Sequence, residues 1–235
     1  MLNNKLVQYL QGFLDIIFPN TCAACGKVLY YNEKSLCLNC YIDLPKTGYH
    51  LDTENEVSRL FWGRIPFNKA TSFIFFSKES RFRHIIHEIK YKNQQDLAVY
   101  MGRLFGLELV GSDFSCADLI VPVPLHPVKL KRRGYNQSQL IAKGLSEILK
   151  IPVMSDLLFR ISNTKSQTKK TRFDRWLNVE NTFMLNQKRP VSNKHILLVD
   201  DVITTGATIE ACAGALYKLS GITVSIASLA YVKLR

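Results

Sequence analysis

One segment near the carboxyl end of this 235-residue chain constrains the fold more than any other. An apolar run, residues 196–199, leads into Asp200 and Asp201 and then into a turn of small and hydroxyl-bearing residues, 204–208. A short apolar run that meets such a turn and then a helical pattern is typical of a buried strand followed by a helix. The segment therefore predicts a strand–turn–helix unit of an α/β protein.

From about residue 66 the chain repeats this alternation of strand and helix. The segments that predict strands are 70–76, 118–124, 195–199 and 222–229. The segments with helical periodicity are 81–110, 136–150 and 206–220. Residues 162–178 are polar, basic and poorly periodic, which predicts a mobile loop. Alternation of this kind favours a mostly parallel sheet with helices on both faces, which we expect over residues 46–235.

Four of the six cysteines form two Cys-x-x-Cys pairs near the start of the chain. They are Cys22, Cys25, Cys37 and Cys40, with eleven residues between the pairs. Each pair can present two thiolates from a tight turn, so together they predict a closed tetrahedral zinc site. Two disulfides or a redox-active pair are the alternatives; disulfides fit poorly without a secretion signal, and a redox site needs only one pair. Four thiolates leave no position for a substrate, so we expect a structural zinc.

The zinc module is expected to span residues 1–45 and to begin with a short amphipathic helix. Apolar side chains stand at helical spacing in residues 1–18, at Leu2, Leu6, Leu10, Phe13 and Ile17. Packing on its own domain is the first interpretation, and a partner or membrane face is the alternative. We expect no signal peptide and no membrane span, because no run reaches about 18 uncharged apolar residues. A cytoplasmic protein follows, with peripheral membrane contact left open.

The charge balance indicates partners that carry phosphate. Lys and Arg number 31 against 19 Asp and Glu, a net charge of +12. Much of the excess lies between residues 129 and 175, where twelve basic residues face three acidic ones. A solvated basic face is the alternative interpretation. With 47% hydrophobic residues, the chain is also too apolar and too long for a disordered protein or a small disulfide scaffold.

The turn at residues 204–208 has the composition of a phosphate-binding loop. Successive backbone N–H groups and threonine hydroxyls can point at one phosphate, and the following helix adds the positive end of its dipole. Asp200 and Asp201 suit sugar hydroxyls and can influence a Mg²⁺ ion. Together these features predict a ribose 5-phosphate site. The alternative is a threonine-rich helix cap beside two solvated aspartates; Walker and dinucleotide-binding motifs are both missing.

Residues 199–208 resemble the phosphoribosyl pyrophosphate (PRPP) motif of type I phosphoribosyltransferases. The cysteine pairs, Val-Pro-Val-Pro-Leu-His-Pro at 121–127 and Arg-Arg-Gly-Tyr-Asn-Gln at 132–137 together resemble the ComF family of competence-associated proteins over nearly the whole chain. The resemblance implies a type I phosphoribosyltransferase-like parallel sheet flanked by helices, preceded by a small zinc ribbon-like module. Because the chain begins Met1-Leu2, we expect no N-terminal cysteine nucleophile and no glutaminase domain.

The resemblance also implies roles for individual residues. Asp200 and Asp201 would be the catalytic pair, bound to the ribose 2- and 3-hydroxyls of PRPP with Mg²⁺ nearby. The 5-phosphate would lie against Thr204, Thr205, Gly206, Ala207 and Thr208. The candidates for pyrophosphate binding, which follow Pro124 or lie in the basic loop, are Leu125, His126, Lys129, Arg132, Arg133, Lys169, Lys170, Arg172 and Arg175. Such cations would neutralise the leaving pyrophosphate, and a closing loop would exclude water.

Three functions remain open at this stage. The chain could be a phosphoribosyltransferase that transfers a pentosyl group from PRPP to an unidentified nitrogen acceptor. It could instead handle single-stranded DNA during DNA uptake, with other uptake proteins at the inner face of the membrane, or it could sense PRPP without turnover. No residue in 41–95, the segment expected to select the acceptor, identifies a base.

Several other side chains carry expectations of their own. Tyr91 and Tyr135, each flanked by basic residues, are candidates for base stacking. His84 and His87 are expected at or near the surface, without a metal. We expect a core position for a set of aromatic residues, Phe61, Trp62, Phe67, Phe73, Phe75 and Phe76, and a core or helix position for Cys116 and Cys212.

Overall fold

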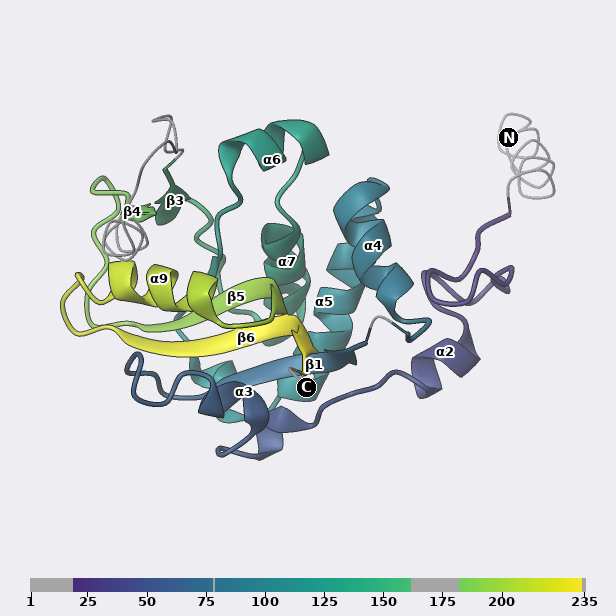
Figure 1. Cartoon of the computed structure of the whole chain (residues 1–235), viewed down its shortest axis with the longest axis horizontal. Coiled ribbons are helices and arrows are strands. Elements are labelled where there is room, and N and C mark those ends of the chain that lie inside the picture. The colour runs from purple at the N-terminus through teal and green to yellow at the C-terminus, as the bar shows by residue number, and fades with distance from the viewer. Residues whose placement is uncertain (1–18, 78, 162–181, 234–235) are drawn as a thin grey trace, which may run out of the picture.

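The computed structural model describes residues 19–77, 79–161 and 182–233 (Figure 1). Two expectations from the sequence fall outside this range. They are the amphipathic helix of residues 1–18 and the basic loop, including Lys169, Lys170, Arg172 and Arg175. Within the described part of the chain, no helix is both long and apolar enough to cross a membrane.

The centre of the fold is a four-stranded sheet in the order β1-β6-β5-β2. Its strands are β1 (Ala70–Phe76), β6 (Thr223–Val232), β5 (His195–Ile203) and β2 (Leu119–Pro122). Every neighbouring pair runs parallel, with Ala70 opposite Ile226, His195 opposite Thr223 and Leu119 opposite Ile196. The carboxyl ends of all four strands therefore meet at one edge of the sheet, where ligands of α/β proteins bind.

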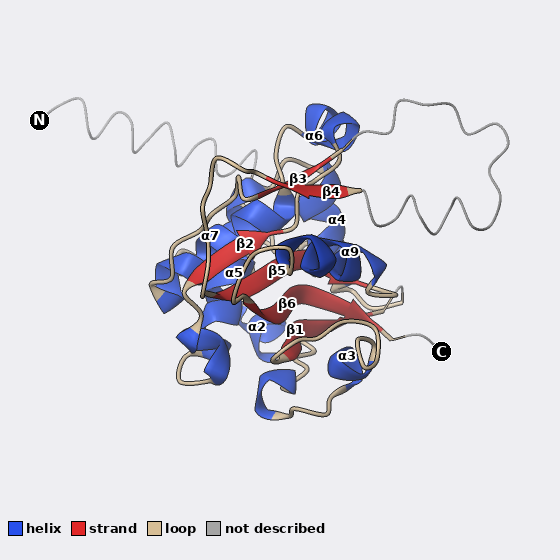
Figure 2. Ribbon diagram, turned by 90° about the vertical axis from the view of Figure 1, so that its left-hand side faces the viewer, coloured by secondary structure: helices blue, strands red, loops and turns tan. Residues whose placement is uncertain are grey.

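Helices cover both faces of this sheet (Figure 2). Along β5 the buried side chains alternate: Leu197 and Val199 pack with α5 (Gln95–Leu109) and α7 (Gln137–Leu149), while Ile196 and Leu198 pack with α9 (Ala207–Leu216). A strand that is apolar on both faces must be covered on both, which is why its sequence is a continuous apolar run. The expected parallel sheet flanked by helices is confirmed.

The single helical segment expected over residues 81–110 is two helices, so that expectation is wrong in its boundaries. Helix α4 (Arg83–Tyr91) ends before Asn93, which adopts a left-handed conformation with φ of 56°, and α5 starts at Gln95. Asparagine tolerates this conformation better than most residues, so the chain changes direction there. As a result the carboxyl end of α4 lies near the carboxyl edge of the sheet, where Lys90 contacts Asp201, while α5 packs on one face of the sheet.

Helices α5 and α7 approach each other unusually closely because glycines stand at their contact. A Cβ atom on Gly102 would lie 2.3 Å from the carbonyl oxygen of Ile141, and one on Gly144 would lie 2.2 Å from that of Val99. No larger side chain fits such a contact without separating the helices. The two glycines thus set the distance between the helices that support β5 and β2.

The remaining described elements are short. They are α2 (Leu38–Ile42), η1 (Tyr49–Leu51), α3 (Glu56–Arg59), η2 (Asp113–Cys116), α6 (Pro127–Arg133), β3 (Leu158–Arg160) and β4 (Phe183–Leu185). Strands β3 and β4 form a separate antiparallel pair on the side of the sheet that carries α9.

The cysteine module lies at one end of the longest axis of the molecule (Figure 1). Its buried residues, among them Ala24, Leu36 and Leu44, belong to the same apolar cluster as Ile85 of α4 and Leu97 of α5. The module therefore packs on the helical layer through a shared core. The division at residues 1–45 and 46–235 stays a prediction.

Trp62, which was expected in the core, and Cys116, which was expected in the core or in a helix, are both exposed. Trp62 is 51% exposed because the preceding residue, Phe61, turns its ring inward beneath the start of α9 and leaves Trp62 over the side chain of Arg59. Cys116 is also exposed, at the end of η2, so it is a helix residue but not a core residue. Cys212 is fully buried in α9, as expected.

Candidate functional site

The acidic pair lies inside β5, not after it as the sequence suggested, because the strand continues to Ile203. The neighbouring strand β2 ends at Pro122, and the N–H group of Val123 donates to the carbonyl oxygen of Val199 at 2.8 Å. The chain that follows β2 thus leaves the sheet immediately beside Asp200. This juxtaposition places the start of the predicted pyrophosphate loop next to the acidic pair.

The predicted phosphate loop connects β5 to α9. Its residues line one small hollow of about 30 Å³ together with Asp200. The loop residues in that hollow are Thr204, Thr205, Gly206, Ala207 and Thr208. The N-terminus of α9 opens into the same hollow, so the backbone N–H groups at the start of this helix can reach an anion there.

Gly206 is required at its position for two reasons. Its φ of +78° is one that side chains with a Cβ adopt only with strain. An added Cβ would also lie 2.7 Å from Cε1 of Phe61, whose ring supports the loop from below. The shape of the loop therefore depends on a residue far upstream in the chain.

Arg64 braces the same loop, a role that the sequence did not reveal. Its Nη1 donates to the carbonyl oxygen of Thr205 at 2.9 Å and to that of Leu60 at 2.9 Å. Its Nη2 forms an ion pair with Glu210 of α9. These contacts fix the position of Thr205 relative to the start of α9.

Asp200 is held by hydrogen bonds that come from α7 and from its own strand. Its Oδ1 accepts from the hydroxyl of Ser138 at 3.0 Å and from the N–H of Asp201 at 2.8 Å. Burial, and after it the charge of Asp201, raises the pKa of Asp200 from 3.8 to about 7. The carboxyl group can therefore change its protonation state near neutral pH. Ser138 was not a candidate from the sequence, since nothing local links it to β5.

Lys90 of α4 is the second residue that sequence reasoning missed as part of the site. Its Nζ lies 3.1 Å from Oδ2 of Asp201, and both side chains are less than one quarter exposed. One lysine beside two carboxylates leaves a negative balance in a partly buried place. Carboxylate oxygens with uncompensated charge are suitable Mg²⁺ ligands, so the donor set fits this ion.

The predicted pyrophosphate residues that the structure describes lie beside the acidic pair without contacting it. His126 caps α6, since its Nδ1 accepts from the N–H of Val128 at 3.2 Å. Leu125 is half-buried, and Lys129 and Arg132 extend from α6 into solvent. Among the described contacts, none joins Lys129, Arg132 or Arg133 to either aspartate.

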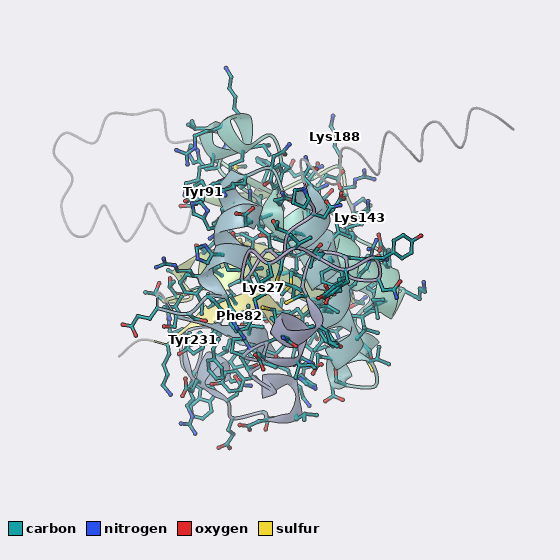
Figure 3. All side chains as sticks on the ribbon, turned by 90° about the vertical axis from the view of Figure 1, so that its right-hand side faces the viewer. Lys27, Phe82, Tyr91, Lys143, Lys188 and Tyr231 are labelled. Atoms are coloured by element: carbon teal, nitrogen blue, oxygen red, sulfur yellow. The ribbon has the colours of Figure 1, made fainter. Side chains whose placement is uncertain are left out.

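Arg133, the last residue of α6, instead contacts Tyr91 of α4. Its guanidinium lies 5.1 Å from the ring centroid of Tyr91, and the ring centroid of His87 lies 5.1 Å from the same ring. Tyr91 is 59% exposed and lies on the outside of the molecule (Figure 3). His84 and His87 are exposed, as expected. The exposed part of the Tyr91 ring can therefore contact a ligand.

The other predicted stacking residue, Tyr135, is buried, so that prediction is wrong. Its hydroxyl donates to the carbonyl oxygen of Ile89 at 2.6 Å, which ties the segment before α7 to the end of α4. Both tyrosines have basic neighbours, so the sequence alone does not distinguish them. The burial of Tyr135 and its hydrogen bond to Ile89 do.

The four cysteines converge as the sequence predicted. The Sγ atoms of Cys22, Cys25, Cys37 and Cys40 all lie within 4.8 Å of one another. All four are free thiols, and Gly26, with φ of 74°, makes the turn after the first pair. Burial raises the pKa of the Cys22 thiol, but hydrogen bonds from the backbone of Cys37, Cys25 and Ala24 outweigh it and lower the pKa to about 7. Such a group of thiols fits a tetrahedral zinc ion.

A larger cavity lies elsewhere among the described residues. It has a volume of about 750 Å³ and lies between the cysteine module and the helices α4 and α5. Its lining contains neither the loop 204–208 nor the acidic pair of β5, so it does not match a ribose 5-phosphate.

Comparisons with known proteins fit this arrangement. No protein-family model matches the sequence. The chain is 29% identical over 209 residues to DNA utilization protein YhgH of Escherichia coli strain K12, covering 87% of each chain. It is 32% identical over 151 residues to competence protein F of Haemophilus influenzae, covering 62% of this chain and 66% of the relative. It is 30% identical over 115 residues to competence protein ComFC of Bacillus subtilis, covering 49% and 44%.

Solved structures with some similarity include phosphoribosyltransferases. Glutamine PRPP amidotransferase of Bacillus subtilis has a TM-score of 0.42 at 18% identity, covering 60% of this chain and 30% of that one. A hypoxanthine phosphoribosyltransferase of Staphylococcus aureus has a TM-score of 0.39 at 15% identity, covering 66% and 73%.

The parallel sheet flanked by helices is the fold that the resemblance to type I phosphoribosyltransferases implied. A four-cysteine module precedes that sheet, and the relatives to which this chain is similar include competence protein F and ComFC.

Proposed function

We propose that this chain binds PRPP together with Mg²⁺ at the carboxyl edge of its sheet. One observation carries the proposal: Asp200, the loop 204–208 and the start of α9 line a single hollow. An anion-binding helix end beside carboxylates matches a ligand that combines a phosphate with vicinal hydroxyls.

The parts of the site would divide the ligand between them. The loop from Thr204 to Thr208 would hold the 5-phosphate, and Asp200 and Asp201 would accept hydrogen bonds from the ribose hydroxyls. Cations after β2, with Lys129, Arg132 and Arg133 as candidates, would face the pyrophosphate, joined by the basic loop. Mg²⁺ would supply positive charge that offsets the diphosphate. Lys90 and Ser138 would position the two aspartates through the contacts described above.

Calorimetric titration of PRPP in the presence of Mg²⁺ tests this proposal. The wild type should bind, and Asp200→Asn/Asp201→Asn should weaken binding at least about tenfold, as expected for the loss of charge-assisted hydrogen bonds. Asp113→Asn, at an exposed aspartate of η2 far from the loop in sequence, is the matched control and should bind like the wild type. A wild type that does not bind PRPP would contradict the proposal.

Binding leaves two roles to be distinguished, transferase and sensor. A transferase releases pyrophosphate when PRPP and the right nitrogen acceptor are both present. A sensor binds PRPP without release. A pyrophosphate-release measurement across a panel of nucleobases and small amines separates the two.

A second candidate function, binding of single-stranded DNA, is favoured by the surface around Tyr91. An exposed aromatic ring beside the guanidinium of Arg133 combines a stacking surface with a cation. The names of the relatives, which refer to DNA utilization and competence, support this role. In the cell we place the protein in the cytoplasm, in DNA uptake, with other uptake proteins at the inner face of the membrane as partners.

Fluorescence anisotropy with a labelled single-stranded oligonucleotide tests the second function. Binding should weaken steeply with salt because bound cations release counterions from the phosphates. Tyr91→Ala should weaken it about fivefold or more, as the loss of one stacking contact predicts. Trp62→Ala, an exposed aromatic on another surface, should leave it unchanged. Binding that ignores both salt and Tyr91 would count against this function.

A further inference from the structure

The cysteine module exposes a cluster of large apolar side chains that the site at the sheet edge does not use. Tyr30 and Tyr31 are 82% and 104% exposed, and three aliphatic side chains of the same module are each more than half exposed. We call this set of residues the module tip. Its members are Val28, Tyr30, Tyr31, Leu38 and Ile42. A single exposed apolar residue is common, but several on one small module indicate a surface that contacts something else.

The module tip is held in shape by Glu33. Its carboxylate accepts from the N–H of Tyr30 at 2.8 Å and from the N–H of Leu38 at 2.6 Å, and its own N–H donates to the carbonyl oxygen of Tyr30 at 2.8 Å. One side chain thereby joins the tyrosine turn to the first residue of α2. These hydrogen bonds fix the position of the tyrosine turn relative to α2.

Helix α2 has two chemically different sides. Cys40 points inward to the cysteine cluster, while Leu38, Tyr41 and Ile42, spaced three and four residues apart, are exposed. Residues at this spacing lie on one helical face. Helix α2 therefore faces the cysteine cluster with Cys40 and exposes its apolar residues to solvent.

The charges around the module tip favour an anionic partner. The Glu33 carboxylate is occupied by the two N–H groups, and Asp43 is paired with Arg81 at 2.5 Å. Lys27 and Lys34 are exposed, and neither forms an ion pair with another described residue. The figure that looks onto the module shows Lys27 on its outer side (Figure 3). Unpaired lysines together with exposed apolar side chains complement a partner that has an anionic outer layer over an apolar interior.

We infer that the module tip docks on the surface of a phospholipid bilayer. Tyrosine is well suited to this place, since its ring enters the interface while its hydroxyl stays among the headgroups. Lys27 and Lys34 add attraction to anionic lipids. The module lies at one end of the long axis of the molecule, so a flat surface can meet it there (Figure 1). The inference does not depend on PRPP binding.

Flotation of the full chain with lipid vesicles tests the inference. The wild type should float with phosphatidylcholine vesicles that contain phosphatidylglycerol and less with pure phosphatidylcholine. Tyr30→Ser/Tyr31→Ser should weaken binding to both vesicle types at least about tenfold. Lys27→Gln/Lys34→Gln should remove the preference for anionic vesicles, a loss of about fivefold per lysine. Trp62→Ser, an exposed aromatic outside the tip, should behave like the wild type.

Other outcomes would overturn the inference. If the tyrosine variant binds vesicles like the wild type but Leu6→Ser/Leu10→Ser does not, the amino-terminal segment is the contact. If no vesicle binds but the chain dimerises in a way that the tyrosine variant abolishes, the tip is an interface between copies. If neither occurs, the tip is not a membrane contact. Zinc content and thermal midpoint of each variant show that the module is folded, and PRPP titration keeps this result separate from the proposed function.

Discussion

At the scale of single residues, Asp200 links protonation to stability. Its pKa is raised from 3.8 to about 7 by burial and by the charge of Asp201. In this pH window the folded chain holds a proton that the unfolded chain has released, so the free energy of unfolding falls as pH rises through it. The acidic pair is thus a local source of instability near neutral pH.

Asp200→Asn should remove that instability. We expect the variant to be more stable than the wild type, and this difference in unfolding free energy should grow by about 1–2 kcal/mol from about pH 5 to about pH 8. The change is smaller than a fully buried group would give, because Asp200 remains partly accessible. Denaturant unfolding at several pH values measures this gain. A difference between variant and wild type that does not change with pH would contradict the assignment.

Gly206→Ala should damage the phosphate loop with little effect on the rest of the fold. The added Cβ meets both an unfavourable φ and the ring of Phe61. We expect a loss of about 1–3 kcal/mol in stability and at least a tenfold loss of PRPP affinity by calorimetry. Gly214→Ala is the matched control in the same helix, because its Cβ would meet nothing within 4 Å. It should leave binding unchanged and stabilise slightly.

At the scale of elements, the contact between α5 and α7 is the least tolerant part of the structure. Gly144→Ala should lower the free energy of unfolding by about 3 kcal/mol, because the methyl group collides with backbone atoms of α5 that cannot move independently. Thermal or denaturant unfolding measures this cost, again with Gly214→Ala as control. A Gly144→Ala chain as stable as the wild type would show that the helices are further apart than described.

Most elements could be predicted from the sequence because their signals are local. The strand at residues 70–76, the helix capped by Asn136 and the cysteine cluster all follow from spacing and residue type. The break at Asn93 was missed because apolar periodicity continues across it, and only the left-handed backbone at one residue separates the two helices. The strand β5 was predicted too short because Asp200 and Asp201 have low strand propensity, which pairing with β6 overrides.

Only those residues of the candidate site that are close together in the chain could be predicted. Asp200, Asp201 and residues 204–208 are consecutive, so their pattern is visible in the chain. Lys90 and Ser138 reach the site from helices more than fifty residues upstream of it, and no local pattern reports such contacts. Their roles as positioning residues, like the whole assignment of the site, stay predictions until binding is measured.

At the scale of the whole molecule, the cysteine module and the sheet should unfold together. Removing zinc with a chelator, or Cys40→Ser, should lower the thermal midpoint of the entire chain, because the module shares its apolar core with Ile85 and Leu97. Far-UV circular dichroism and metal analysis follow the two events. Cys116→Ser, at an exposed cysteine outside the cluster, should change neither. A midpoint that ignores the metal would contradict the zinc assignment.

The ring of Phe61 under Gly206, together with the brace from Arg64, has a consequence for dissecting this protein. Both residues come before the first strand. A shortened chain that starts at β1 would keep every strand and the whole acidic motif but would lose the two residues that support the loop 204–208. Such a fragment should fold around its sheet and still fail to hold a phosphorylated sugar. Any minimal version of the pocket has to reach back at least to the turn that carries Phe61.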